Sequence, residues 1–321
     1  MKKKYRRLSR RKFIKNVTAA GTVVTMTGLS LPDLKAQGKN AVNRPICIFS
    51  KHLQWLNYDE MADVCAKIGF DGVDLTVRPG GHVLPENVTV DLVQAKKAVD
   101  RAGLAMPMIT TAITDPDDPV TKKILQTARD CGIKYYRMGY LHYKKEMAVD
   151  TCLEQYKPLL ADLARLNEIC KIHGAYQNHA GTNIGAPVWD LWLLMRDLNP
   201  DWIGCQYDIR HATVEGANSW PIALNLLHSY IRCMVIKDFK WANIDGDWRI
   251  ENVPVGEGMV DFRRYFLLLK ELNITGPISL HYEYPVLTES DNRLSLTDKK
   301  KKTIEIMKRD LIKVRKMLEE I

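Results

Sequence analysis

The sequence of 321 residues predicts a closed (β/α)8 barrel, and three observations carry that prediction. From residue 44 onward, short runs rich in β-branched and aromatic residues alternate eight times with amphipathic helical runs. Glycine stands at several helix-to-strand joins, where it favours the end of a helix. The G-x-G-x-x-G turn of an open nucleotide-binding sheet does not follow the first strand. We therefore expect a single barrel domain over residues 41–321, after a signal and linker over residues 1–40.

The strands are expected where a run of apolar, β-branched or aromatic residues is bounded by turn-forming residues. Parallel strands in such a barrel are buried on both faces, so their runs are more continuously apolar than those of an open antiparallel sheet. The eight predicted strands cover residues 45–49, 72–77, 105–111, 135–140, 175–180, 203–209, 233–239 and 278–284.

The helices are expected where apolar residues recur at spacings of three and four. The clearest case begins after Asp261, a favoured N-cap residue, and carries the apolar stripe Phe262, Tyr265, Phe266 and Leu269. The predicted helices cover residues 57–68, 89–102, 119–131, 151–172, 188–198, 218–230, 261–272 and 298–320.

Most of the chain's positive charge lies near the N-terminus. The net charge is +9, but residues 1–37 hold ten of the 47 basic residues and one of the 38 acidic ones. The remaining 37 basic and 37 acidic residues cancel. A nucleic-acid binder needs a basic surface, so we expect no nucleic-acid partner for the barrel.

The N-terminal segment has the pattern of an export signal. An apolar run of about 15 residues, too short for a membrane-spanning helix, follows the basic start. Residues 9–15 read Ser-Arg-Arg-Lys-Phe-Ile-Lys, which resembles the twin-arginine signal at nearly every position. The resemblance implies passage through the twin-arginine translocon to the periplasm. Cleavage after Ala36 and retention at the inner membrane by an uncleaved signal are both open.

Polar and charged side chains gather at the carboxyl ends of the predicted strands, where the active site of such a barrel lies. Residues two apart share one face of a strand, so several of them are expected to point into the barrel. A charged group buried there is costly unless it is paired or functional. These residues are Arg78, His82, Gln177, His179, Asp208, His211, Lys237, Trp241, His281 and Glu283.

Three of these groups carry the prediction of a site, because Asp208, Lys237 and Glu283 end three different strands and should face one another across one pocket. Other readings stay open for the rest. Arg78 could form a structural ion pair with Asp74 at the barrel rim. Trp241 could pack against its neighbours or stack on a sugar face.

The stretches Gly72–His82, Gln177–Gly181, Tyr207–His211, Ile236–Trp241 and Ser279–Glu283 together resemble the xylose isomerase-like barrel superfamily over residues 44–320. The resemblance implies a divalent metal (Mn, Mg, Co or Zn) held by Glu, Asp, His and Glu at successive strand ends. The Asp and the last Glu fall on Asp208 and Glu283. The first Glu falls on Gln177, whose carbonyl oxygen is a weaker ligand, and the His falls on Val235, which cannot ligate.

The resemblance implies an enzyme that transfers a proton at the carbon next to a sugar carbonyl, as an isomerase or epimerase does. We expect Glu283 to abstract the proton, Lys237 to stabilise the oxyanion in place of the metal, and His179 to be the second acid or base. Two alternatives remain: a keto-glycoside lyase or hydratase, and a barrel that binds a saccharide without turnover. A nucleotide cofactor is not expected. The residues expected to bind the sugar are Arg78, His82, Gln177, His211, Trp241 and His281.

Overall fold

The structure, a computed structural model, describes residues 44–321, and these form a closed barrel of eight parallel strands. The strands follow one another around the barrel in the order β1-β2-β3-β4-β5-β6-β7-β10, and β10 pairs with β1 to close it. Their bounds are β1 Ile46–Phe49, β2 Gly72–Val77, β3 Ala105–Thr111, β4 Tyr135–Arg137, β5 His173–Gln177, β6 Ile203–Asp208, β7 Ile231–Ile236 and β10 Ile278–Leu280. The predicted (β/α)8 barrel is confirmed.

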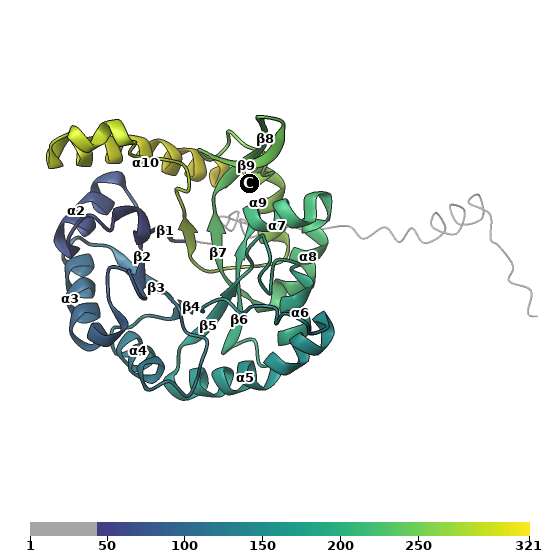
Figure 1. Cartoon of the computed structure of the whole chain (residues 1–321). Helices are drawn as coiled ribbons and strands as arrows, with labels where there is room; N and C mark the ends of the chain where they lie inside the picture. Colours follow the sequence, from purple (N-terminus) through teal and green to yellow (C-terminus); the bar gives the residue numbers. More distant parts are fainter. Residues whose placement is uncertain (1–43) are drawn as a thin grey trace, which may run out of the picture. The chain divides into compact units, whose positions relative to one another are not determined.

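The helices surround the strands, as the view along the barrel shows (Figure 1). Short 3-10 turns fill several connections. The helices are α2 Tyr58–Ile68, α3 Val88–Arg101, α4 Pro119–Asp130, α5 Val149–Cys170, α6 Trp189–Met195, α7 Ile209–Gly216, α8 Trp220–Leu227, α9 Phe262–Glu271 and α10 Leu296–Glu319. The 3-10 turns are η1 Ser50–Leu53, η2 Pro85–Asn87, η3 Ala217–Ser219, η4 His228–Tyr230 and η5 Glu289–Arg293. In the described part of the chain, no helix is long and apolar enough to cross a bilayer.

Strand β2 shows how the alternation of side chains builds both the core and the site. Its odd-numbered residues Val73, Leu75 and Val77 belong to the apolar core that includes the surrounding helices. Its even-numbered residues Asp74 and Thr76 are buried on the other face, inside the barrel. Burying the first set stabilises the fold, at about 1.5–3 kcal/mol for each large aliphatic side chain. The second set supplies the polar lining on which the site is built.

Five of the predicted strands extend beyond the carboxyl ends of the observed ones, and two of these five overlap other elements. The strand predicted over 203–209 ends at Asp208, because its carboxylate accepts the backbone N–H of His211 and caps the unexpected helix α7. The strand predicted over 233–239 ends at Ile236. An antiparallel hairpin of β8 Asp238–Ile244 and β9 Asp247–Val253 then follows.

The hairpin has a sequence signal that the predicted strand boundaries overlook. Asp245 and Gly246 separate its two strands and both have positive φ, 54° and 92°. An Asp-Gly pair between alternating runs is typical of a two-residue hairpin turn, because both positions need the left-handed conformation. The expected twin-arginine segment, residues 9–15, lies outside the described residues.

Candidate active site

The site forms around Lys237, which follows β7 directly and is only 4% exposed. Its Nζ lies 3.1 Å from Asp208 Oδ2 and 4.0 Å from Glu283 Oε1. The structure therefore brings together the three charged groups that the sequence singles out, from the ends of β6, β7 and β10. Their roles in catalysis stay predictions.

Asp208 is held rigidly, because its main chain and its side chain are both fixed by neighbours. Asn178 brackets its backbone, accepting the N–H of Asp208 at 2.7 Å and donating to its carbonyl at 2.9 Å. Gln177 Nε2 donates to Asp208 Oδ2 at 2.8 Å. These hydrogen bonds fix the direction of the Asp208 carboxylate. Asn178 is not among the site residues predicted from the sequence, although it is a polar residue beside Gln177 at a strand end.

Glu283 faces the same ammonium group from the other side. It lies 3.8 Å from His281 Nδ1 and 3.5 Å from the partly exposed Lys51 Nζ. The neighbouring His281 ring, followed by the charges of Lys237 and Lys51, holds the pKa of Glu283 well below its usual range against the opposing effect of burial. Burial lowers the pKa of Lys237, while the charges of Asp208 and Glu283 oppose that effect.

The histidines near this cluster are neutral. Burial lowers the pKa of His281 to about 3 and that of His211 well below its usual value. His179 is half-buried, its pKa is also lowered by burial, and its Nδ1 is bonded to the carbonyl of Ala180 at 2.8 Å. A neutral ring that donates from Nδ1 keeps a lone pair on Nε2, so His179 can act as a base.

His211 holds a fixed orientation beside Asp208. Its Nδ1 accepts a hydrogen bond from Arg210 at 3.0 Å, and its Nε2 lies 3.6 Å from Asp208 Oδ2. Its ring also packs against that of His179, with centroids 3.9 Å apart. His211 thus lines the cluster, as expected, but its side chain is only 3% exposed. This leaves it little surface for direct contact with a sugar.

Gln177 connects the cluster to the opposite side of the barrel mouth. Its Oε1 accepts hydrogen bonds from Arg137 Nη1 at 3.1 Å and from Tyr140 OH at 2.7 Å, while its Nε2 donates to Asp208. Neither Arg137 nor Tyr140 is among the site residues predicted from the sequence. Arg137 is a charged residue within the predicted strand over 135–140, and Tyr140 is the last residue of that strand.

Two predicted sugar-binding residues do not join the cluster. His82 uses both ring nitrogens locally, on Ser50 Oγ at 3.1 Å and on the carbonyl of Leu53 at 3.2 Å. It therefore fastens the turn after β2 to the segment after β1. Trp241 lies on the hairpin strand β8, 41% exposed, with its ring edge-on to Phe239. The structure places neither ring beside Lys237.

Arg78 does not form the structural ion pair with Asp74 that the sequence allowed. Asp74 instead accepts hydrogen bonds from Ser279 Oγ at 2.7 Å and Thr110 Oγ1 at 2.9 Å, while the Arg78 guanidinium lies over the ring of Phe49 at 5.7 Å. Phe49 stacks in turn on His281, with centroids 4.2 Å apart. The Arg78 side chain stays free at the barrel mouth.

The expected divalent-metal site is not assembled by these residues. Lys237 places its ammonium group between the two carboxylates that would bind the cation. Gln177 turns its amide nitrogen toward Asp208, and its oxygen is already taken by Arg137 and Tyr140. Among residues 44–321, no group of three His, Cys, Asp or Glu side chains could hold a metal ion. The residues as placed do not fit a divalent cation, since a hard cation needs several free oxygen ligands.

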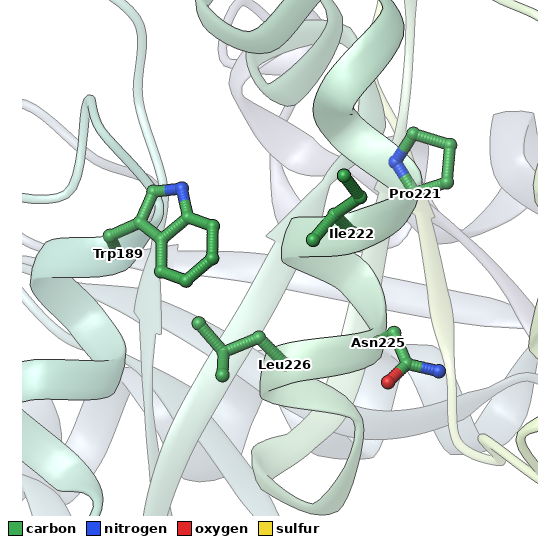
Figure 2. Close-up of a pocket in the computed structure, with 5 residues that line it drawn as sticks. All are labelled: Trp189, Pro221, Ile222, Asn225 and Leu226. Atoms are coloured by element: carbon green, nitrogen blue, oxygen red, sulfur yellow. The ribbon is translucent and has the colours of Figure 1, made fainter.

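A groove on the outer surface has none of this chemistry. It has a volume of about 370 Å³ and lies between helices α6 and α8 (Figure 2). Its lining holds no ionisable side chain, so it cannot supply an acid or a base. The residues that line it are Trp189, Pro221, Ile222, Asn225 and Leu226.

Comparison with known families identifies the barrel. The family described as the xylose isomerase-like TIM barrel matches residues 62–309, most of the chain. The chain belongs to the xylose isomerase-like TIM barrel family. The family expected from the strand-end motifs is thereby confirmed. Comparison with curated proteins gives no match.

Solved structures of similar fold include sugar epimerases and a probable dehydratase. A 3-keto-D-glucoside 4-epimerase from E. coli matches with a TM-score of 0.62 at 14% identity, covering 85% of this chain and 100% of that one. A D-psicose 3-epimerase from Clostridium cellulolyticum H10 matches with a TM-score of 0.61 at 12% identity, covering 85% and 99%. A probable 3-DHS dehydratase from Bacillus anthracis matches with a TM-score of 0.58 at 14% identity, covering 83% and 97%. At these identities the likeness establishes the shared fold.

Proposed function

We propose that the protein catalyses proton transfer at the carbon next to a sugar carbonyl, as an isomerase or epimerase does. The observation that carries the proposal is the buried Lys237 ammonium group, held 3.1 Å from Asp208 and 4.0 Å from Glu283 at the barrel mouth. Membership of the family and the fold shared with sugar epimerases support a sugar as the substrate. Fold alone does not fix a reaction, so the proposal rests on the side chains.

Lys237 takes the part that a metal ion has in metal-dependent sugar isomerisation. Its ammonium group donates a hydrogen bond to the carbonyl oxygen and stabilises the negative charge that develops there. Glu283 takes the proton from the neighbouring carbon, and the C–H electron pair becomes the C=C bond of an enediolate. When Lys237 turns toward this oxygen, Glu283 loses part of the charge stabilisation that lowers its pKa, and its basicity rises.

His179 supplies the second proton-transfer group. His179 follows β5, and β6 lies between β5 and β7, the strand that Lys237 follows. Glu283 follows β10, which lies on the other side of β7. The neutral ring can therefore accept a hydroxyl proton while Glu283 acts on the carbon. Delivery of a proton to the opposite face of the same carbon gives epimerisation, and delivery to the neighbouring carbon gives isomerisation.

Isotope exchange tests the proposal. Full-length protein is incubated with a panel of ketoses, aldoses and keto-glycosides in D₂O, and loss of the α-proton signal is followed by NMR. We expect exchange in at least one sugar, and loss of that exchange in Glu283→Gln. Lys67→Met, which alters an exposed lysine paired with Asp63, is the matched control for substitutions at Lys237. Absence of exchange throughout the panel would leave the proposal without support.

Product analysis separates the two enzymatic alternatives. In a keto-glycoside lyase the same enediolate would expel the group on the next carbon, so a free aglycone would appear. A saccharide-binding barrel without turnover would bind sugars and exchange no proton. Keto-glycosides are included in the substrate panel because the chain shares its fold with a 3-keto-D-glucoside epimerase and a probable dehydratase.

Export to the periplasm through the twin-arginine translocon is part of the proposal and rests on the motif at residues 9–15. Replacing Arg10 and Arg11 together with lysine is expected to retain the protein in the cytoplasm of the producing cell. Cell fractionation measures this. An unchanged distribution would show that the segment is not a twin-arginine signal.

A further inference from the structure

Two arginines on the β2–β4 side of the barrel mouth have no acidic partner within ion-pair distance among residues 44–321. Arg210, just after β6, has none either, but its guanidinium donates hydrogen bonds to His211 and Asn252. Arg137, on β4, is only 5% exposed. Its Nη1 donates to Gln177 and Tyr140, both neutral, and its buried Nε has no hydrogen-bond partner. Arg78, just after β2, is half-buried and meets only the ring face of Phe49. A buried guanidinium without an anion is costly, so this arrangement needs a reason.

Many arginines on the outer surface behave differently. Eight of them form ion pairs with aspartates, although their exposure to water makes such pairing worth little. The absence of an acid beside Arg78 and Arg137 therefore sets the mouth apart from much of the surface. The surface pairs are Arg101–Asp59, Arg129–Asp130, Arg165–Asp162, Arg196–Asp197, Arg232–Asp201, Arg249–Asp247, Arg309–Asp310 and Arg315–Asp71.

The acids nearest to the two arginines are already occupied. Asp74 accepts hydrogen bonds from Ser279 and Thr110, and burial raises its pKa to about 6 although these hydrogen bonds and the charges of Arg137 and Arg78 oppose that effect. Glu283 pairs with Lys237, His281 and Lys51. The charged groups around the cluster are the basic Arg78, Arg137, Arg210, Lys237 and Lys51 and the acidic Asp74, Asp208 and Glu283. This excess of basic groups would favour a bound anion.

Arg78 and Arg137 border the same part of the mouth. Strand β3 separates β2 from β4, and at this level it presents Thr110, which pairs in register with Thr76 on one side and Arg137 on the other. A short threonine leaves space between the two long side chains. Their mutual influence agrees with this, since burial and then the charge of Arg137 lower the pKa of Arg78.

The unused edge of Arg137 suits one kind of anion. Nη1 is taken by Gln177 and Tyr140, which leaves Nε and Nη2, the edge that a planar carboxylate binds with two parallel hydrogen bonds. We propose that the substrate is an acidic sugar whose carboxylate is held by Arg137 and Arg78, on the side of the mouth facing the Lys237 cluster. This inference rests on the proposed function for the ligand being a sugar, and it adds the substrate class.

Calorimetry with full-length protein tests the inference without requiring turnover. The probes are D-glucuronate and D-galacturonate, their neutral parents glucose and galactose, and glucose 6-phosphate. We expect at least one uronate to bind about tenfold or more tightly than its parent, as charge-assisted hydrogen bonds to a carboxylate imply. Equal binding of acid and parent, or tight binding of the phosphate alone, would overturn the carboxylate assignment.

Variants then locate the binding. Arg78→Gln, at a half-buried position, is expected to weaken uronate binding by about tenfold, and to weaken binding of the neutral parent by much less. The matched control is Arg263→Gln, an exposed arginine on α9, which should change neither. Uronate binding that survives Arg78→Gln and Arg137→Gln would place the anion elsewhere and overturn the inference.

The two proposals can fail separately. Proton exchange in neutral sugars without preference for uronates would leave the proposed function standing and overturn the substrate class. Selective, arginine-dependent binding of uronates without exchange in any of them would support the anion site and count against the proposed reaction.

Discussion

The two sides of the barrel mouth are built on opposite principles. On the side of β6, β7 and β10, Lys237 lies between Asp208 and Glu283, so the ammonium charge is balanced within the protein. On the side of β2, β3 and β4, Arg78 and Arg137 lack acids among the described residues. Gln177 on β5 links the sides by hydrogen bonds, and Phe49 on β1 links them by ring contacts. We call the side of β6, β7 and β10 the complete side, because its ammonium charge is balanced without a ligand. We call the side of β2, β3 and β4 the incomplete side, because a bound anion would balance the charges of its two arginines.

The largest expected effect comes from removing the central charge of the complete side. Lys237→Met is expected to lower the α-proton exchange rate by about 10²–10⁴, because the oxyanion loses its stabilising group. It should also lower the free energy of unfolding by about 3–5 kcal/mol, since Asp208 is left as a buried, unpaired charge. Exchange kinetics and urea denaturation measure the two effects.

A double variant separates the two losses. Adding Asp208→Asn to Lys237→Met removes the unpaired charge, so stability should return while exchange stays lost. If Lys237→Met alone retained full exchange and full stability, the comparison between the two sides would fail, because the ammonium group would have no role on the first.

Acid pH should act in opposite directions on the two sides. His281 has its pKa lowered to about 3 by burial, against about 6.5 in the unfolded chain, so stability falls as pH drops below about 6.5. Asp74 has its pKa raised to about 6, against about 3.9 unfolded, so it adds stability as pH drops from about 6 toward 4. Each group changes the free energy of unfolding by up to about 1.4 kcal/mol per pH unit.

Urea denaturation between pH 7 and pH 4 measures this opposition. Asp74→Asn should lose stability more steeply than the wild type as the solution is acidified, and His281→Gln less steeply. If the free energy of unfolding depends on pH with the same slope in all three proteins, burial does not shift the pKa values of Asp74 and His281 as expected.

Removing an arginine from the incomplete side should cost the fold nothing. Arg137→Met retains much of the aliphatic part of the side chain but removes a buried charge without an anion, so the free energy of unfolding should stay unchanged or rise by about 1 kcal/mol. Gln177 keeps its hydrogen bond from Tyr140. A loss above about 3 kcal/mol in urea denaturation would show that Arg137 stabilises the fold itself.

The smallest effect is expected on the outer surface. Arg101→Gln breaks the ion pair with Asp59, where both side chains are more than half exposed. Such pairs contribute about 0–1 kcal/mol, so the change in the free energy of unfolding should stay within about 0.5 kcal/mol. A larger loss in the free energy of unfolding would mean that exposed arginine ion pairs also stabilise the fold.

The order of the amino acids is enough to specify the barrel and the position of its charged groups along the chain. Alternation of strands and helices is a local pattern, and the carboxyl ends of parallel strands must meet at one end of a barrel. Asp208, Lys237 and Glu283 can therefore be assigned to one site from the sequence alone. The β8–β9 hairpin is equally readable from Asp245 and Gly246, although the predicted strand over 233–239 runs into it.

Which partner each polar side chain meets depends on the tertiary structure. His82 and Gln177 are both polar residues at strand ends, yet one bonds to its own loop and the segment after β1, and the other joins the two sides of the mouth. The missing acid beside Arg137 is likewise visible only once every neighbour is in place. Pairing depends on which residues from distant parts of the chain come within about 3 Å, and spacing along one strand does not contain that information.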